Sequence, residues 1–172
     1  MRVQLISGLA LLIIGILGRL LPHPPNFTPV DAVALFSGAW LTSRWLGFVL
    51  PLVLMAGTDI WLGWHDLWPF TWGATLMGVL IGRYFLRWIQ WREVAALSVL
   101  QATLFFLLTN LGVWMTGAYG YTWEGLALCY GAAIPFYHYQ VLGALLYSTL
   151  FWAVGRFAIR FFFRESPAFS PE

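Results

Sequence analysis

Residues 94–115 read VAALSVLQATLFFLLTNLGVWM, an uninterrupted stretch of apolar and small uncharged residues. A helix that crosses the hydrocarbon core of a bilayer needs about 20 such residues, whereas a helix on the surface of a soluble protein has a charged or polar face. This stretch contains no Asp, Glu, Lys or Arg. It therefore predicts a transmembrane helix, and the rest of the fold has to be compatible with a membrane.

The composition extends this prediction to the whole chain of 172 residues. Hydrophobic residues make up 60% and charged residues only 9%, and the mean hydropathy is +0.77. Soluble domains carry about 25% charged residues because their surfaces must be hydrated. We therefore expect lipid to be the main solvent of this protein, and a mass of 19.5 kDa leaves room for a single domain.

Charges, prolines and turn residues divide the chain into six candidate spans. They cover residues 3–21, 29–43, 45–63, 70–87, 94–115 and 139–162. We expect an all-α membrane bundle of six transmembrane helices over 1–164, followed by a short cytoplasmic tail at 165–172. The second span is short, since at about 1.5 Å per residue it reaches only about 22 Å. Three accommodations are open: little tilt, local thinning of the membrane, or shielding by neighbouring helices.

Prolines and capping residues mark several span boundaries. Thr28 precedes Pro29, and Asp31 follows at the third helical position, which is typical of a capping threonine, a first-turn proline and an acid near the helix start. Pro69 marks the start of the fourth span in a similar way. Pro51 lies inside the third span and is expected to kink it.

The arginines give the predicted bundle a direction. All nine basic residues are arginine, and when the six spans alternate, one side receives eight of them while the other receives only Arg19. The eight are Arg2, Arg44, Arg83, Arg87, Arg92, Arg156, Arg160 and Arg164. Short loops rich in arginine remain in the cytoplasm, so both termini are expected there. An odd number of spans would destroy this asymmetry.

Tryptophan placement predicts the same orientation, because indole side chains collect at membrane–water interfaces. The predicted outer boundary holds Trp61, Trp64, Trp68, Trp72, Trp114 and Trp123. The predicted inner boundary holds Trp40, Trp45, Trp88 and Trp91. Only Trp152 falls in the middle of a span.

Several functional classes lack the residues that they need. No continuous basic face exists for a nucleic acid, and the single cysteine, Cys129, excludes an internal disulfide. There is no nucleophile–base pairing, no phosphate-binding glycine loop and no HExxH pattern, so we do not expect an enzyme, and no cofactor can be named. An ion or proton pathway needs polar residues across the bilayer midplane, where only Gln101 qualifies well.

Polar residues gather in three predicted outer segments, at 22–28, 64–68 and 116–140. Ligand pockets are mostly apolar with a few placed hydrogen-bonding groups, and these segments supply both kinds of residue. The candidate substrate-binding residues are Asn26, Asp59, His65, Asn110, Trp114, Tyr121 and His138. The alternative is that these loops are polar because they face water.

Asp59 is the candidate with the strongest physical argument. It lies inside the third span, about one turn from its outer end, and a carboxylate at such a depth costs a few kcal/mol unless it faces the bundle interior or a cavity. The alternative is that the side chain reaches the interface or caps a neighbouring helix.

The three histidines raise the question of a metal. His23, His65 and His138 all lie on the predicted outer side, and imidazole suits zinc, cobalt, nickel or copper. No two of them are three or four residues apart, the spacing that would place a pair on one helix face. We predict no metal site, and these residues remain weak candidates.

A small-residue motif lies in the fourth span. Gly78 and Gly82 form a GxxxG pattern, and Ala74 extends it by one turn. Small residues four apart let two helices approach closely. The motif is compatible with packing inside the bundle and with docking to another membrane protein.

Motifs spread over residues 22–155 resemble those of an uncharacterised family of bacterial multi-pass membrane proteins. They are HPPNFTPV at 23–30, ALFSGA at 34–39, TDIWLG at 58–63, FFLLTNLGVW at 105–114 and LCYGAAIPF at 128–136. That family is in turn similar to the substrate-binding S components of energy-coupling-factor vitamin transporters. The resemblance implies a protein of the bacterial cytoplasmic (inner) membrane, with cytoplasmic chain ends and a substrate pocket formed by the outward loops.

The resemblance implies uptake of a small molecule, either vitamin-like or a metal-containing micronutrient. One departure concerns the docking motif that S components use on their shared coupling subunit, an Ala-x-x-x-Ala pair in helix 1, which residues 7–15 lack. The alternative function is a non-catalytic accessory or structural subunit packed against a larger membrane complex, with aromatic residues and the Ala74/Gly78/Gly82 ridge as its contact surface. The expected partners are therefore the lipid bilayer, a small-molecule ligand and, in the alternative, other membrane subunits.

Overall fold

The computed structural model describes residues 2–86 and 90–162, without the side chains of residues 2, 3 and 159–162. The described chain folds into six α-helices and is all-α, as predicted. The helices are α1 (Arg2–Leu20), α2 (Val30–Trp40), α3 (Arg44–Leu62), α4 (Trp68–Phe85), α5 (Trp91–Met115) and α6 (Trp123–Phe162). The predicted tail at 165–172 lies outside the described residues.

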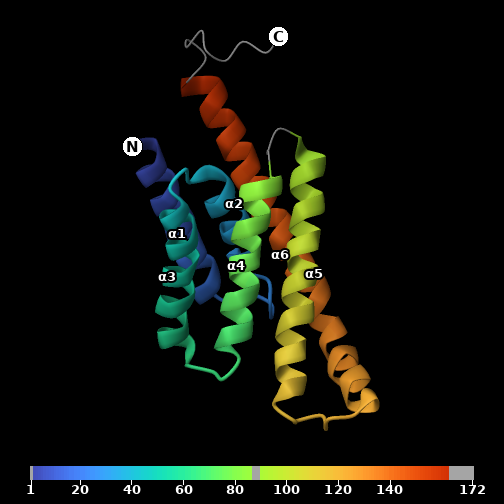
Figure 1. Ribbon diagram of the computed structural model, residues 1–172. Coiled ribbons are helices and arrows are strands. Elements are labelled where there is room, and N and C mark those ends of the chain that lie inside the picture. The colour runs from blue at the N-terminus through green and yellow to red at the C-terminus, as the bar shows by residue number, and fades with distance from the viewer. Residues whose placement is uncertain (1, 87–89, 163–172) are drawn as a thin grey trace.

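The helices run alternately up and down, and the start of α1 and the end of α6 lie at the same end of the bundle (Figure 1). We call this end the arginine end, because α3, α4, α5 and α6 bring Arg44, Arg83, Arg92 and Arg156 to it. Arg19 closes α1 at the other end, which we call the distal end. The described part of the chain does not include Arg87, Trp88, Arg164 or the side chains of Arg2 and Arg160. The described arginines therefore have the asymmetry that the sequence predicted.

The short helix α2 forms the centre of the bundle. It has 11 residues, fewer than the predicted 29–43, and spans about 16 Å. Every residue from Val30 to Gly38 is buried, and α2 contacts all five other helices. Those helices surround it, with α1 beside α3, then α4, α5 and α6 in turn. Three ways to accommodate the short second span were open, and the structure therefore has the third, in which neighbouring helices shield it.

Glycines permit the close crossing of α2 and α4. A Cβ atom on Gly82 would lie 1.9 Å from the carbonyl oxygen of Leu35, and one on Gly38 would lie 2.1 Å from that of Val79. A Cβ on Gly78 would meet Ala34 at 2.9 Å. The GxxxG motif therefore packs α4 against α2 inside the bundle, and its small residues are not a surface for another protein.

The start of α2 differs from the predicted capping box. Pro29 rather than Thr28 occupies the N-cap position, no side chain caps the helix, and the Pro29 carbonyl accepts the bond from Val33 N at 2.8 Å. The Thr28 N–H donates to Asn26 O at 3.0 Å, in a turn that holds Asn26 at a φ of 63°. Asparagine tolerates this left-handed conformation better than most residues. The prediction failed because Asp31 is buried at the bundle centre, where it makes tertiary hydrogen bonds instead.

The last helix begins at Trp123, not at residue 139, so the predicted outer stretch 116–140 is mostly helical. The Thr122 Oγ1 accepts a hydrogen bond from Gly125 N at 3.1 Å and caps the helix start. Pro135 lies inside the helix, where it removes one backbone hydrogen bond without ending the helix. The prediction failed because Pro135 and the polar residues around it were interpreted as loop signals.

Tyrosines fasten this additional helical segment to α5. Tyr130 donates to Leu107 O at 2.6 Å, and the Tyr137 and Thr103 hydroxyls are 2.7 Å apart. Both rings contact Phe106, with centroid distances of 5.7 and 4.8 Å. Tyr130 and Tyr137 are seven residues apart, about two helical turns, and this spacing was the sequence signal for the longer helix.

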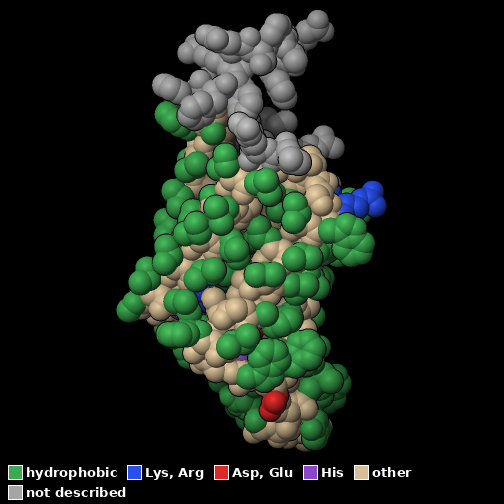
Figure 2. Space-filling model, turned by 90° about the vertical axis from the view of Figure 1, so that its left-hand side faces the viewer, with side chains coloured by type: hydrophobic (Ala, Val, Ile, Leu, Met, Phe, Trp, Pro, Cys, Tyr) green, Lys and Arg blue, Asp and Glu red, His purple; other side chains and the backbone are tan. Residues whose placement is uncertain are grey.

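Among the described residues, three segments are long and apolar enough to cross a membrane by length and composition: Arg44–Leu62, Trp91–Met115 and Trp123–Ala158, with mean hydropathies of 1.7, 1.8 and 1.4. Figure 2 shows the face over α1 and α3, which is covered almost entirely by hydrophobic side chains. Many are widely exposed, including Ile6 at 67% and Ile60 at 75%. Such surface belongs in lipid, so the chain is a multi-pass helical membrane protein.

Candidate binding cavity at the distal end

A cavity of about 470 Å³ lies in the distal half of the bundle. All six helices line it, together with the α1–α2 and α3–α4 loops. Its polar lining residues are Arg19, His23, Asn26, Thr28, Asp31, His65, Thr71, Thr109, Asn110 and Gln140. Its apolar lining includes Met55, Phe105, Val113 and Phe136. Apolar walls with placed polar groups are typical of small-molecule sites.

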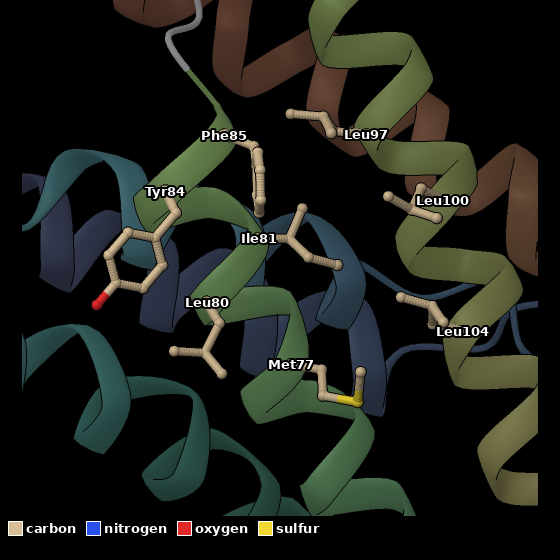
Figure 3. A pocket seen from close by; sticks show the side chains of 8 residues that line it. All are labelled: Met77, Leu80, Ile81, Tyr84, Phe85, Leu97, Leu100 and Leu104. Atoms are coloured by element: carbon tan, nitrogen blue, oxygen red, sulfur yellow. The ribbon is translucent and has the colours of Figure 1, made fainter.

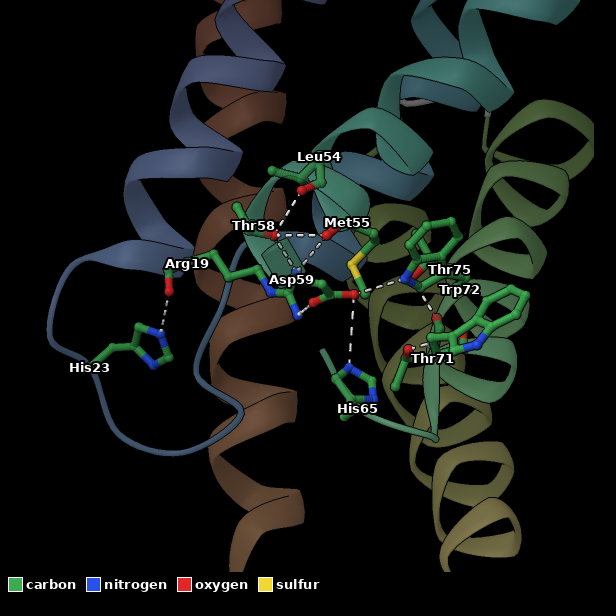
Figure 4. Close-up of polar contacts among 11 residues, drawn as sticks. Arg19, His23, Leu54, Met55, Thr58, Asp59, His65, Thr71, Trp72 and Thr75 are labelled. Atoms are coloured by element: carbon green, nitrogen blue, oxygen red, sulfur yellow. Dashed lines mark hydrogen bonds and ion pairs between the residues drawn. The ribbon is translucent and has the colours of Figure 1, made fainter. Parts of the chain in front are cut away.

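Arg19 and Asp59 form an ion pair beside this cavity (Figure 4). The Arg19 Nη2 lies 2.7 Å from Asp59 Oδ1, and the side chains are only 15% and 2% exposed. Arg19 also donates to the Thr58 hydroxyl, and the Trp72 indole N–H donates to Asp59 Oδ2 at 2.8 Å. Such partners offset the desolvation of two charges in an apolar bundle.

Two histidines extend this network toward the loops. The His65 Nε2 lies 3.8 Å from Asp59 Oδ2, and Figure 4 marks this contact with a dashed line. The His23 ring nitrogens lie 2.8 Å from Pro24 O and 3.2 Å from Arg19 O. His23 and His65 come from different loops and both line the cavity. The ion pair therefore connects α1, α3 and both loops around one site.

A second polar cluster lies where α2 meets the cavity. Asp31 is 4% exposed, and its two carboxylate oxygens accept hydrogen bonds from Gln101 Nε2 and Gln140 Nε2, each at 3.1 Å. Gln101 Nε2 also donates to Ala74 O at 3.1 Å. The cluster joins α2, α4, α5 and α6, and both Asp31 and Gln140 line the cavity.

A profile of a family of unknown function, DUF6580, matches residues 1–166. The chain belongs to the DUF6580 family. No curated protein and no solved structure matches it. The family description assigns no ligand or activity, so any function of this DUF6580 protein has to be argued from its own geometry.

Three of the candidate residues line the cavity of this DUF6580 protein: Asn26, His65 and Asn110. Asn110 donates to Phe106 O at 2.8 Å, which leaves its side-chain oxygen as an acceptor for a ligand. Asp59 does not line the cavity but lies behind Arg19, which does. These four residues therefore belong to one site, although they come from α3, α5 and two loops.

The other three candidates lie away from the cavity. Tyr121 is 71% exposed, and its hydroxyl donates to Met115 O at 3.2 Å. The Trp114 ring packs edge-on against Tyr121, with centroids 6.0 Å apart. His138 is exposed on α6, where its ring lies against the neighbouring Tyr139. The position of His138 follows from the unpredicted helical segment at the start of α6.

The charged and glutamine residues that line the cavity were not among the candidates: Arg19, Asp31 and Gln140. Two of them carried a sequence signal. Arg19 was the lone arginine on its side, and Asp31 was an acid within an apolar span. Asp31 had been attributed to helix capping, and Gln140 to a loop. The packing of α2 at the centre assigns both to the cavity.

The metal-ligand candidates do not form a cluster in this DUF6580 protein. His23 and His65 line the cavity, whereas His138 does not. Within the described residues, no group of three or more His, Cys, Asp or Glu side chains is placed to hold a metal ion.

A smaller cavity of about 260 Å³ lies between α4 and α5 (Figure 3). Its lining residues are Met77, Leu80, Ile81, Tyr84, Phe85, Leu97, Leu100 and Leu104. The Tyr84 hydroxyl points away from the α5 side chains. This apolar lining offers no hydrogen bond to fix a polar ligand, so the distal cavity is the candidate site.

Proposed function

We propose that this DUF6580 protein is an S-component-like membrane protein that binds a small molecule in its distal cavity for uptake. The observation that carries the proposal is the cavity itself, around which ten polar side chains gather at one end of a bundle with an apolar surface. Two of them, Asp31 and Gln140, are buried, and a bundle that needed only stability would have apolar side chains there, because buried polar groups cost free energy. The ligand class is vitamin-like or a metal-containing micronutrient, and the role involves no catalysis.

The proposal places the bundle across the bacterial cytoplasmic membrane with the arginine end in the cytoplasm. The positive-inside rule supports this orientation. Five helices would face lipid and α2 would lie among them without crossing the full membrane, which gives a six-helix topology with both termini inside. The distal cavity then lies toward the outer face, where a ligand arrives.

The length of α6 is compatible with this placement. Its 40 residues extend about 60 Å, about twice the hydrocarbon thickness. A helix of this length must tilt strongly or extend beyond the membrane. Its first half packs on α5 beside the cavity, so part of the binding site lies close to the outer interface.

Two neighbouring alanines of α6 provide a matched test. Ala133 lines the cavity, whereas Ala132 is exposed and does not. The full chain is purified under mild conditions, and its co-purifying small molecules are identified by mass spectrometry. An Ala133→Phe substitution fills the cavity, so we expect it to lower ligand occupancy at least about tenfold, equivalent to a binding loss of about 1.4 kcal/mol. Ala132→Phe should leave occupancy unchanged.

Uptake is tested separately with the identified ligand. Cells that express the wild-type chain should accumulate more of it than cells that express Ala133→Phe, at equal protein abundance in the membrane. Protein that carries no small molecule, or equal occupancy in both phenylalanine variants, would contradict binding in this cavity.

The alternative, an accessory subunit of a larger membrane complex, has one observation in its favour. The smaller apolar cavity between α4 and α5 is open to a lipid chain or a helix of another protein, since Tyr84 and Phe85 in its lining are 67% and 65% exposed. Extraction in a mild detergent followed by size measurement tests it. A stoichiometric partner would support this alternative, and a monomer-sized species would exclude it.

A further inference from the structure

The Asp31 carboxylate has an unusual environment for a buried acid. It is 4% exposed at the centre of a membrane bundle, and its hydrogen bonds come from the neutral amides of Gln101 and Gln140. Both oxygens accept an amide hydrogen bond, as the oxygens of an ionised carboxylate do. An isolated carboxylate in an apolar environment is very costly, so a compensating positive charge is expected.

The protein does not supply that charge itself. The chain has no lysine. Arg19 lines the same cavity but is paired with Asp59 at 2.7 Å, and the other described arginines lie at the arginine end. Among the described residues, no arginine or histidine lies within ion-pair distance of Asp31. The Arg19–Asp59 pair is neutral overall, so when Asp59 is counted with the lining residues and the histidines are neutral, Asp31 leaves the site with a net negative charge.

A second observation comes from Gln101. Its side chain is fully buried, and its Nε2 already donates to Asp31 and Ala74 O. Its Oε1 has no hydrogen-bond partner. A buried acceptor without a donor costs about 1–3 kcal/mol. The cluster therefore lacks hydrogen-bond donors as well as positive charge.

Of these two groups, Asp31 lines the cavity and Gln101 does not, so a cavity ligand would act at Asp31. A protonated amine carries a positive charge and as many as three N–H donors, whereas a carboxylate or a phosphate would repel the Asp31 carboxylate. A carboxylate of this kind, lining a cavity, can accept further hydrogen bonds from the cavity side. The apolar side chains of Met55, Phe105 and Phe136 line other parts of the same cavity and would contact an uncharged body.

We propose that the ligand of the distal cavity carries a protonated amine that pairs with Asp31. This inference rests on the proposed function, because it presupposes that the cavity binds a small molecule. It specifies the class as a cationic molecule of moderate size with an apolar or aromatic body. Asp31 is then the residue that determines charge selectivity.

Three probes that differ only at one end group test the proposal: tyramine, tyrosol and 4-hydroxyphenylacetate. They carry an ammonium, a hydroxyl and a carboxylate on the same phenol ring. Binding to the purified full-length protein is measured by equilibrium dialysis, after removal of co-purified ligand. We expect tyramine to bind at least about tenfold more tightly than tyrosol, and the carboxylate to bind more weakly still.

The variant Asp31→Asn removes the charge and keeps the side-chain size, so the preference for tyramine over tyrosol should disappear. Asp66→Asn is the matched control, because it removes an acid from an exposed position at the same end of the protein, outside the cavity lining. It should keep the tenfold preference. The comparison of the three probes on the wild-type protein stands even if Asp31→Asn does not fold.

The possible results separate this inference from the proposed function. Equal binding of all three probes, or tighter binding of the carboxylate, would overturn the role of Asp31 and leave small-molecule binding intact. An unchanged amine preference in Asp31→Asn would also overturn it. If no probe binds and no small molecule co-purifies, both proposals fail.

Discussion

At the scale of single residues, the ion pair of Arg19 and Asp59 is where charge is most costly and most closely compensated. Asp59 is 2% exposed and receives bonds from Arg19 and from the Trp72 indole. Removing one member of such a pair leaves an uncompensated buried charge, whereas replacing both by apolar residues is often tolerated. The pair is therefore expected to hold the distal ends of α1 and α3 together.

This account predicts that Asp59→Asn destabilises the protein by about 3–5 kcal/mol, because the Arg19 guanidinium loses its counter-charge. Thermal unfolding in detergent, followed by the circular dichroism of the helices, measures the change. The double variant Arg19→Met/Asp59→Leu should recover at least half of the loss. A double variant as unstable as the single one would show that packing, rather than charge, makes the site sensitive.

Residue-level reasoning predicted part of the site. Asp59, His65, Asn26 and Asn110 could be identified because polar residues near the outer ends of apolar spans usually face a cavity or water. Asp31 was misassigned, because a local explanation, helix capping, accounted for it equally well. Local sequence cannot reveal that Gln101, seventy positions later, is its hydrogen-bond partner.

At the scale of elements, the crossing of α2 and α4 determines how the bundle packs. Leu35 O would lie 1.9 Å from a Cβ on Gly82, and the colliding atom is backbone, which cannot move aside like a flexible side chain. The GxxxG motif was visible in the sequence, but its partner helix was not. The burial of α2 on all sides explains why so short an apolar helix is stable in this protein.

Glycine-to-alanine substitutions at different positions of α4 should therefore differ sharply in their effect on the stability of the fold. We expect Gly82→Ala to destabilise the fold by about 1–3 kcal/mol or more, because overpacking forces α2 and α4 apart. Gly73→Ala in the same helix meets no atom within 4 Å and should be neutral or slightly stabilising. Thermal unfolding and the yield of monodisperse protein measure both. Equal effects of the two substitutions would contradict the close crossing.

At the scale of the whole molecule, the uneven distribution of arginine between the two ends of the bundle is the feature with functional consequence. The described arginines other than Arg19 lie at one end, and the polar cavity lies at the other. If the positive-inside rule sets the orientation, the cavity is toward the outer face. The proposed binding and uptake of a ligand from outside depend on this orientation.

Single cysteines test the orientation in intact cells. The background is Cys129→Ala, which removes the only natural cysteine. Asp66→Cys places a thiol in the α3–α4 loop, and Thr42→Cys places one in the α2–α3 turn, and both positions are exposed. A membrane-impermeant maleimide should label Asp66→Cys directly and Thr42→Cys only after permeabilisation. The reverse pattern would place the cavity toward the cytoplasm.

The sequence alone determined that this protein belongs in a membrane, and it predicted six helices and the gathering of arginine at one end. These properties depend on local composition, because the bilayer selects long apolar segments and the charges beside them. Tertiary structure decided that α2 lies at the centre, that α6 begins at Trp123, and that Asp31 and Gln140 line a cavity while Gln101 bonds Asp31 from behind it. Such contacts join residues as many as 109 positions apart, and apolar periodicity carries no information about which helix faces which.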